Sequence, residues 1–312
     1  MRLKVLGSAA GGGFPQWNCN FDLSRAAREG AEGVKPRTQS SLAACANGAD
    51  WIIINASPDI RAQIMSTRDL KPAEDAPLRS TPISAVVLTN ADVDHIAGLL
   101  SLRERQAFVI YATSRVLQVL DQNSIFNVLD PAIVKRRELA LDIATSILTW
   151  DDRPTGVTVE AFAVPGKVAL FLEDTTQADK GFGTQVGDTI GLKISSDATP
   201  AAAHYIPGCA RIDNKLKERL HQSSCLLFDG TVYTDAEMMT SGVGSKTGQR
   251  MGHMHISGPD GSAEALADVE IGRRIYVHIN NTNPILNEHS PQAAAVREKG
   301  WEVAFDGMEI LL

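Results

Sequence analysis

The 312-residue sequence predicts a layered protein of the α/β class. Short β-rich runs alternate with helical stretches along the whole chain, and several predicted strands end in a short loop that leads into a helix. The sequence has no repeat at a fixed period, and no linker divides it into two parts. We therefore expect a single domain over residues 1–312.

The predicted strands are short runs of mainly apolar and β-branched residues. The opening MRLKVLG is interpreted as a strand, because Gly7 interrupts the apolar run well before the roughly 7–15 residues of a secretory signal. In chain order the predicted strands are Leu3–Leu6, Ser40–Cys45, Trp51–Asn55, Ala85–Leu88, Phe108–Tyr111, Val157–Val164, Thr189–Ile194, Ala202–Ile206, Cys225–Phe228, Arg274–Ile279 and Glu302–Ala304.

The predicted helices lie between these strands and after them. They are Pro58–Met65, Asp94–Arg105, Ser114–Asp121, Asn214–Gln222, Ala263–Ala267 and Pro291–Lys299. The polar, glycine-containing stretch Glu173–Gly183 predicts an excursion loop between two strands.

Composition excludes several classes of protein. Hydrophobic residues make up 44% of the chain and charged residues 21%, which is typical of a globular protein and not of a disordered one. The net charge of −7 argues against a nucleic-acid partner, because binding to phosphates requires a basic surface. Aromatic residues make up 5%, which argues against stacking platforms for single strands.

The sequence also indicates the compartment. No apolar run reaches the roughly 18 residues that a membrane span needs, so we expect no membrane span. The four cysteines, Cys19, Cys45, Cys209 and Cys225, are scattered and form no C-x-x-C pair. A reduced, cytoplasmic location is the simplest expectation.

Metal-capable side chains crowd the segment TNADVDH at Thr89–His95. This segment follows an apolar strand and precedes an amphipathic helix, where a site can face solvent. A metal site is one interpretation. An equally supported one is that Asp94 caps the helix and that Asp92 solvates the turn.

A second candidate is His278, which ends a β-branched run. An isolated histidine at a strand end is more often a core residue than a ligand. The four polar side chains at Asn280–Asn283 are harder to explain by packing, and they are suited to orienting a ligand through hydrogen bonds.

Two further segments carry chemistry-capable residues. His253 and His255 form an H-x-H whose flanking glycines suggest a loop, and a plain surface loop explains them almost as well as a site. Asp229 and Asp235 follow an apolar run, but Asp-Gly is also a turn signal, and the turn interpretation is favoured for both.

The glycine-rich loop at Gly7–Gly13 follows the first strand. It has neither the G-x-G-x-x-G spacing nor the G-x-x-x-x-G-K-[ST] spacing of a nucleotide site. Two interpretations stay open, a backbone that approaches a substrate and a tight structural turn.

These residues resemble a known family. The Asn90–His95 segment is similar to the H-x-H-x-D-H signature of the metallo-β-lactamase superfamily. Within that superfamily, the chain resembles the family of B proteins that take part in the biosynthesis of pyrroloquinoline quinone (PQQ). The matching islands are Gly7–Cys19, Pro36–Ala43, Asn55–Ile64, Thr89–Glu104, Phe228–Met238, Gly252–Gly258 and His278–Leu286. The resemblance implies a four-layered αββα sandwich with its site at one edge of the two sheets.

The chain departs from the superfamily pattern at one of two metal positions. The two leading histidines of the signature fall at Asn90 and Asp92, and Val164–Lys167 occupies the region of the third histidine. Ile206–Gly208 stands where the bridging aspartate is expected. A dinuclear hydrolase is therefore disfavoured.

A second departure concerns zinc. Many family members carry C-x-C-x-x-C after the tryptophan, whereas here Cys19 remains with Phe21 and Ser24 in the other two places. We expect no structural zinc.

The remaining ligands imply a single divalent metal. The resemblance assigns Asp94, His95 and His278 as ligands, with Asp92 as a fourth ligand or a catalytic group beside them. His253 matches a histidine that lies beside the metals in phosphodiesterase relatives, and it is predicted to act as an acid/base or a substrate anchor. Two histidines and one carboxylate are typical of non-haem Fe(II) oxygenases, but zinc tolerates the same set, so the ligands alone leave the metal open. The missing second metal position favours Fe(II), because a single metal with free positions has room for dioxygen and a phenol.

The family implies a role in making PQQ from a cross-linked Glu–Tyr pair. We expect an O2-using hydroxylase of a tyrosine-derived precursor, with Ser8, Gln16, Trp17, Asn280 and Asn281 as substrate-binding residues. One alternative is a soluble carrier of PQQ or its precursor toward the periplasm, and another is a zinc-dependent hydrolase. Other proteins of the PQQ pathway are candidate partners.

Overall fold

The strands at the centre of the molecule are apolar along their whole length because both of their faces are buried. In β3 (Trp51–Ile54), Ile52 and Ile54 pack between the two sheets, whereas Trp51 and Ile53 pack beneath the outer helices. Such continuous apolar runs are typical of sheets that are covered on both sides. The computed structural model describes residues 1–178 and 180–312 and confirms the predicted α/β sandwich.

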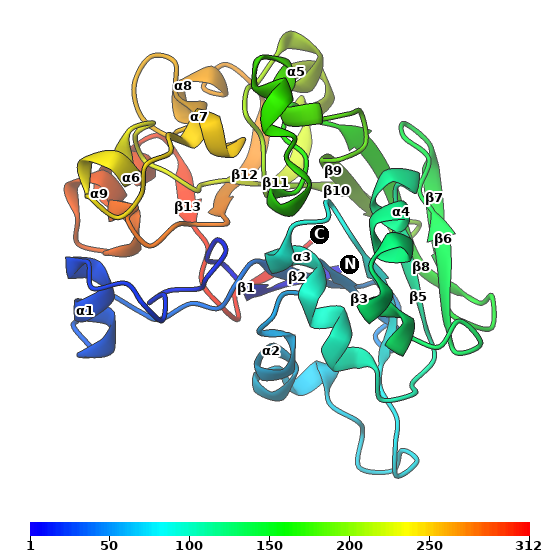
Figure 1. Cartoon of the computed structure of the whole chain (residues 1–312). Coiled ribbons are helices and arrows are strands. Elements are labelled where there is room, and N and C mark those ends of the chain that lie inside the picture. The colour runs from blue at the N-terminus through cyan, green and yellow to red at the C-terminus, as the bar shows by residue number, and fades with distance from the viewer.

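The first sheet comes mostly from the N-terminal half of the chain. Its order is β14-β1-β2-β3-β4-β5-β6, antiparallel from β14 to β3 and parallel from β3 to β6. Besides β3, it contains β1 (Arg2–Gly7), β2 (Ser41–Cys45), β4 (Ile83–Val87), β5 (Phe108–Ala112), β6 (Val134–Glu138) and β14 (Glu309–Leu311). The two chain ends meet in this sheet, where the Met1 ammonium donates a 2.8 Å hydrogen bond to the Leu312 carbonyl (Figure 1).

The second sheet repeats this pattern with the C-terminal half of the chain. Its order is β13-β12-β11-β10-β9-β8-β7, parallel from β13 to β10 and antiparallel from β10 to β7. Its strands are β7 (Ala144–Leu148), β8 (Pro154–Ala163), β9 (Ile190–Ser196), β10 (Thr199–Ile206), β11 (Ser223–Asp229), β12 (Ile271–Val277) and β13 (Trp301–Val303).

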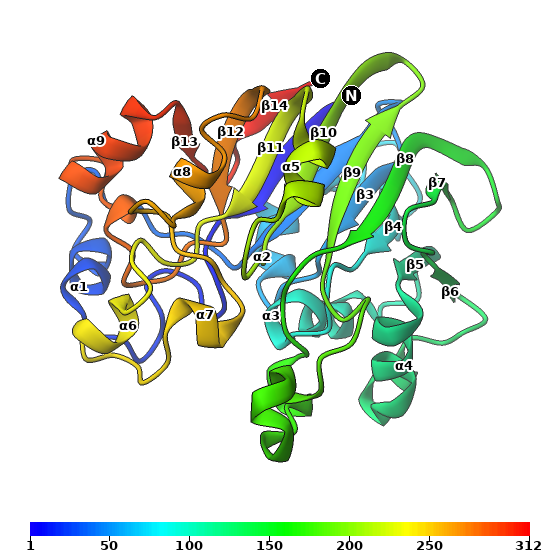
Figure 2. The same cartoon turned by 90° about the horizontal axis from the view of Figure 1, so that it is seen from above.

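Helices cover the outer face of each sheet and complete four layers. Figure 2 shows the two sheets lying one over the other with the helices outside them. One cluster of buried residues lies between the sheets, and two more lie between a sheet and its helices. The helices are α1 (Asp22–Arg28), α2 (Ile60–Ser66), α3 (Val93–Ile96), α4 (Ser114–Gln122), α5 (Asn214–Leu220), α6 (Glu237–Thr240), α7 (Gly248–Met251), α8 (Ser262–Ala265) and α9 (Pro291–Glu298).

The long helix predicted over Asp94–Arg105 is wrong. The α-helix α3 ends at Ile96 and continues as a 3-10 helix, Ala97–Leu102. The cause is contact with the loop after β3: the Ala56 amide donates to the His95 carbonyl, and the Gly98 amide donates to the Ala56 carbonyl, each at 2.8 Å. A side chain at Gly98 would lie 2.1 Å from the Ser57 carbonyl oxygen, so this approach requires glycine. The contact anchors the short helix that carries Asp94 and His95.

Several elements had no prediction, chiefly at the margins of the sheets. The edge strand β6 has the sequence VKRRE, and the other edge strand, β7, has no more than one fully buried residue. Such half-exposed strands lack the apolar run that marks a central strand. The stretch predicted as a loop, Glu173–Gly183, contains a 3-10 segment at Thr175–Gly183, and another 3-10 turn at Leu170–Leu172 precedes it.

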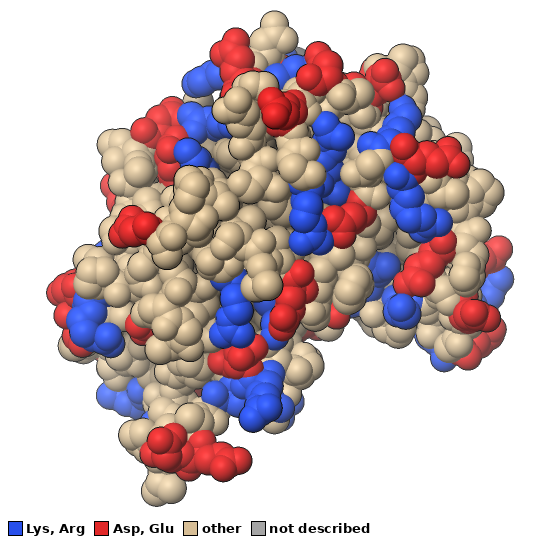
Figure 3. Space-filling model, turned by 180° about the vertical axis from the view of Figure 1, so that it is seen from behind, with Lys and Arg blue, Asp and Glu red and all other residues tan. Residues whose placement is uncertain are grey.

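On the face shown in Figure 3, lysine and arginine side chains are interspersed with aspartate and glutamate side chains, and a broad area between them is uncharged. Among the described residues, no helix combines the length and the apolar character required to cross a bilayer.

Candidate metal site at the edge of the two sheets

Ionisable side chains gather where parallel strands of both sheets end. Asp94 and His95 lie on α3, just after β4, while Asp229 ends β11 and His278 follows β12. The carboxyl ends of parallel strands share one edge of a sheet, so their loops converge there. The strand predicted to include His278 ends one residue earlier in the structure, at Val277. His278 has a φ of 56° and turns the chain sharply at this edge.

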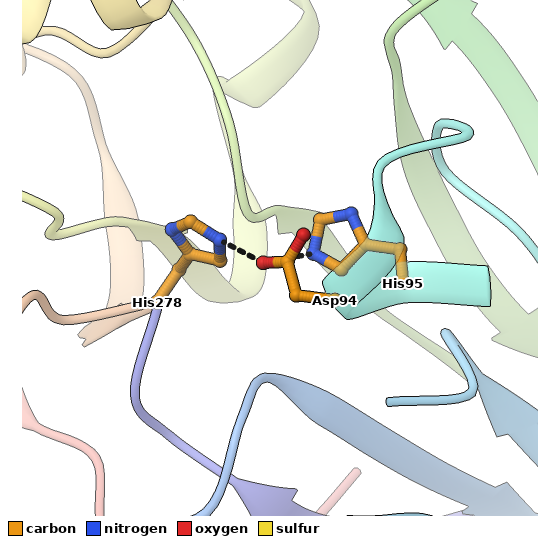
Figure 4. Close-up of side chains that lie close together, drawn as sticks. All are labelled: Asp94, His95 and His278. Carbon is orange, nitrogen blue, oxygen red and sulfur yellow. Dashed lines mark hydrogen bonds and ion pairs between the residues drawn. The ribbon is translucent and has the colours of Figure 1, made fainter. Parts of the chain in front are cut away.

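The structure brings together the three residues predicted as metal ligands. One ligand atom from each of Asp94, His95 and His278 lies within 4.8 Å of the others. The Asp94 Oδ2 atom is 3.2 Å from His278 Nε2 and 3.9 Å from His95 Nε2, so the two rings face one carboxylate from opposite sides (Figure 4). His95 and His278 are buried, whereas Asp94 is partly exposed, with 16% of its side-chain surface accessible.

The electrostatics of this cluster favour a cation. Burial opposes ionisation of Asp94, but the charges of His95 and His278 and a hydrogen bond from His278 outweigh it and hold the pKa of Asp94 well below its usual range. Burial also opposes protonation of His278, and the hydrogen bond and charge of Asp94 outweigh it, so that the pKa of His278 is raised. The space between His278 Nε2 and Asp94 Oδ2, which lie 3.2 Å apart, is thus suited to a positive charge, whether a proton or a metal ion.

A hydrogen bond from Asn90 fixes the orientation of His95. The Asn90 Oδ1 atom accepts from the Asp92 amide at 2.9 Å, which identifies it as the amide oxygen, and it lies 2.7 Å from His95 Nδ1. His95 Nδ1 must then carry the proton, leaving a lone pair on Nε2. This Nε2 is buried and has no hydrogen-bond partner among the described residues, as expected of a ligand atom.

The Thr231 hydroxyl fixes His278 in the same way. Its oxygen is 2.6 Å from Asp229 Oδ1 and 2.9 Å from the His278 carbonyl, and its single hydrogen is donated to one of these acceptors. His278 Nδ1, 2.8 Å away, must therefore donate to the hydroxyl, so its Nε2 points at Asp94 as a potential ligand. The donor set fits a divalent metal bound by Asp94, His95 and His278.

Replacing Thr231 by valine is expected to weaken metal binding by about 10–100-fold, the usual cost of losing a group that orients a ligand. The valine keeps the shape of the side chain but cannot accept the hydrogen bond that His278 Nδ1 donates. Competition of zinc between the protein and a chromophoric chelator measures the affinity. Thr231→Ser retains the hydroxyl and should bind as the wild type does, and equal affinities for the valine and serine variants would contradict this role.

Asp229 lies in the candidate site, although the sequence analysis favoured a turn role alone for it. Its side chain is fully buried, and it accepts a local hydrogen bond from the Thr231 amide at 3.0 Å and a long-range hydrogen bond from the Cys209 amide at 2.9 Å. Its Oδ2 also lies 2.7 Å from His253 Nδ1. Its position at the end of an apolar strand was the sequence signal for a site residue. The glycine that follows made the pair look like an ordinary turn.

Asp229 holds His253 beside the predicted metal site. The His253 ring stacks on His278 with centroids 5.1 Å apart, and its Nδ1 proton is donated to Asp229, which leaves Nε2 as the basic atom. His255 does not take part, since its Nε2 lies 3.3 Å from Asp260. The H-x-H segment is a loop after α7, as its glycines suggested.

A cavity of about 300 Å³ opens beside these side chains, a volume suited to a small molecule. Its wall combines the predicted metal ligands with polar, basic and apolar groups. Besides Asp94, His95 and His278, the lining side chains are Gln16, Asn90, Asp92, Lys167, Leu170, Thr231, Met238, Lys246, Met251, His253 and Asn280.

Two of the five predicted substrate-binding residues, Gln16 and Asn280, line this cavity. Ser8 is fully buried, and its hydroxyl donates to Asp306 at 2.9 Å. Trp17 is 87% exposed and lies outside the cavity. Asn281 is buried behind Gln16, and its Oδ1 accepts a 2.8 Å hydrogen bond from the Gln16 backbone amide. The positions of Ser8, Trp17 and Asn281 therefore give no support to direct substrate contact.

The residues predicted to stand at the superfamily's other metal position make contacts of other kinds. Asn90 orients His95. Asp92 stands at the N-cap position of α3 in place of Asp94, but its side chain does not cap the helix and instead accepts from the Leu170 amide at 2.9 Å. Lys167 donates to Glu173 at 2.8 Å, and Gly208 offers no side chain at all.

The predicted loss of the structural zinc concerns the segment before α1. Within the described ranges, the groups of possible metal ligands do not include Cys19. Ser24, at one of the former cysteine positions, is buried, and its hydroxyl donates to Asn281 at 3.3 Å.

Known proteins resemble the chain in sequence and in structure. Residues 50–279 match the family described as the beta-lactamase superfamily domain. Coenzyme PQQ synthesis protein B of Xanthomonas oryzae pv. oryzae (strain MAFF 311018) is 47% identical over 312 residues, which is 100% of both chains. The protein of that name from Methylorubrum extorquens (strain PA1) is 49% identical over 310 residues, or 99% of each chain.

Solved structures share the fold. The crystal structure of Zn²⁺-bound PqqB from Methylobacterium extorquens has a TM-score of 0.92 at 46% identity, with 100% of both chains covered. A diphosphatase from the PhnP family has a TM-score of 0.67 at 18% identity, with 100% of this chain and 97% of that chain covered.

Proposed function

This chain belongs to the family of coenzyme PQQ synthesis protein B, within the beta-lactamase superfamily, and we propose that it hydroxylates a tyrosine-derived precursor of PQQ with O2 and one divalent iron. A role in PQQ biosynthesis follows from the family. The relative that contains Zn²⁺ supports a divalent metal, and the choice of iron is our proposal.

The observation that carries the proposal is the ligand set. Two histidines and one carboxylate converge on a single position, and a cavity opens beside them. This set with open coordination positions is typical of non-haem Fe(II) oxygenases. Asn90, Lys167 and Gly208 offer no free ligand to the second position of a two-metal hydrolase, and the other group of possible ligands, Asp229, His253 and His278, shares His278 with the first group.

The overall reaction balances with one external reductant. One oxygen atom of O2 enters an aromatic C–H bond, and the other leaves as water with two electrons and two protons from a reductant of the ascorbate or thiol class. Bound iron would supply the activation of O2. The protein supplies the position of the ring and the control of its phenol proton.

The chain's own residues suit these two tasks. His253 is placed to accept the proton of a substrate hydroxyl at Nε2 and to return it, because Asp229 holds the other ring nitrogen in its protonated form. Gln16 and Asn280 present amide groups at the cavity wall, and Asn281 fixes Gln16 from behind. Asp92 ties α3 to the segment above the cavity, which is compatible with a role beside the metal.

An oxygen-labelling experiment tests the proposal. Metal-free protein is loaded anaerobically with Fe(II), mixed with a tyrosine-like substrate and ascorbate, and then exposed to ¹⁸O₂. We expect oxygen uptake and a product that is heavier by one labelled atom, and none from protein loaded with zinc. Zinc-dependent turnover with label from water would favour the hydrolase. Tight PQQ binding with no turnover under either metal would favour the carrier and overturn the hydroxylase.

A further inference from the structure

Two lysines line the metal cavity of a protein whose net charge is −7. Lys167 belongs to the segment after β8, and Lys246 to the loop between α6 and α7, so they reach the cavity from separate parts of the chain. Basic side chains do not help to hold a cation, and placing them in the same cavity wall as metal ligands carries an electrostatic cost when a metal is bound. Their presence in the same wall therefore needs a separate explanation.

The formal charges of the cavity wall leave an excess of positive charge once a metal is bound. The lining residues include two acidic side chains, Asp92 and Asp94, and two basic ones, Lys167 and Lys246, so the wall alone is neutral. A divalent ion then adds two positive charges. A cavity with this balance favours an anionic ligand over a neutral or cationic one.

The two lysines differ in how they are held. Lys167 Nζ donates to Glu173 at 2.8 Å, and the same carboxylate accepts from both terminal nitrogens of Arg250, at 3.1 and 2.7 Å. Lys246 is half-buried and, within residues 1–178 and 180–312, makes neither a hydrogen bond nor an ion pair. Lys246 is thus the cation that a ligand can use without displacing another contact.

The remaining wall is apolar on the same side. Met238 and Met251 flank the loop that carries Lys246, and Leu170 completes the surface from the segment after β8. Met238 is itself held in place by Asn280, whose Nδ2 donates to its sulfur at 2.8 Å. Sulfur and aliphatic groups of this kind form favourable contacts with aromatic rings.

We propose that Lys246 is a specificity-determining residue that binds a carboxylate of an aromatic substrate, while Met238, Met251 and Leu170 hold its ring beside the metal ligands. This inference rests on the proposed function for the position of the ring, but the recognition of a carboxylate does not require hydroxylation. The site then selects aromatic acids with a free carboxylate and rejects the corresponding amides.

A pair of probes that differ by one charge tests this role. The probes are 3-(4-hydroxyphenyl)propanoate and its primary amide, and their binding to zinc-loaded full-length protein is measured by isothermal titration calorimetry. The wild type should bind the acid about tenfold more tightly than the amide, the usual effect of one charge-assisted hydrogen bond. Lys246→Ala should lose this preference by weakening the acid alone, and Lys246→Arg should retain it.

Lys215→Ala is the matched control, because Lys215 is exposed on α5 and does not line the cavity. It should bind both probes as the wild type does. Equal binding of the two probes by the wild type, or no binding of either, would overturn the proposal. A preference for the acid that persists in Lys246→Ala would also overturn it and would place the carboxylate on the metal or on Lys167. These outcomes do not depend on whether the iron-loaded protein hydroxylates anything.

Discussion

His278→Ala is expected to abolish metal binding, so that the purified variant holds no stoichiometric divalent ion after loading with iron or zinc. The substitution removes one of three ligand atoms that lie within 4.8 Å of one another, and it also frees the Thr231 hydroxyl that oriented the ring. Two remaining ligands, one a carboxylate, are too few for a closed zinc or iron site. Metal content by mass spectrometry after desalting is the measurement.

His255→Ala provides the matched control for this variant. It removes the same kind of side chain from the loop that carries His253, but His255 faces Asp260 and does not line the cavity. The control should retain the metal content of the wild type. If the His278 variant binds as much metal as this control, the ligand assignment is wrong.

Asp229→Ala is expected to lower the free energy of unfolding by about 3–5 kcal/mol at pH 7, because each donor left without its acceptor costs about 1–3 kcal/mol. The carboxylate accepts from Cys209, Thr231 and His253, and these buried donors lose their acceptor together. Urea unfolding followed by circular dichroism measures the change.

The pH dependence of this difference has a definite sign. Burial alone would raise the pKa of Asp229, but the charges of His253 and His278 and the hydrogen bonds outweigh it and lower the pKa. The contribution of Asp229 is therefore complete above its unfolded pKa of about 3.9 and is lost as the pH falls through the lower folded pKa.

Asp235→Ala is the control for the loss of an aspartate. Asp235 is only partly buried and accepts from the Gln249 amide at 2.7 Å, so its removal should cost about 0.5–1.5 kcal/mol. If the Asp229 variant is destabilised no more than this control, Asp229 is not the buried anchor described above.

Central strands were predictable because two buried faces require an unbroken apolar sequence, as in the WIII of β3. Edge strands such as β6 were not, since one side of each faces solvent and accepts charged residues. The early end of α3 was also beyond prediction. It depends on a contact between Gly98 and the loop after β3, more than forty positions earlier in the chain, and helix periodicity carries no information on such contacts.

The candidate site shows the same division. Asp94, His95 and His278 were found because ligand-type residues followed apolar strands and matched a family signature. Asp229 and Thr231 were not, because their local pattern is an ordinary turn and their partners, His253 and His278, lie 22 to 47 residues away. The substrate residues were the least predictable, since a polar residue in a loop turns toward the cavity or away from it according to its neighbours.

The sequence by itself determined the chemical inventory of this protein: the apolar strands that indicate a layered α/β fold, the candidate ligand types, and the family resemblance that implied a two-sheet sandwich with one metal position. The tertiary structure decided the states and directions of those groups. Asn90 sets the tautomer of His95, Thr231 that of His278, and Asp229 that of His253. These hydrogen bonds form between strand ends that meet only after the sheets assemble, so their geometry is a property of the packing and not of any local stretch of chain.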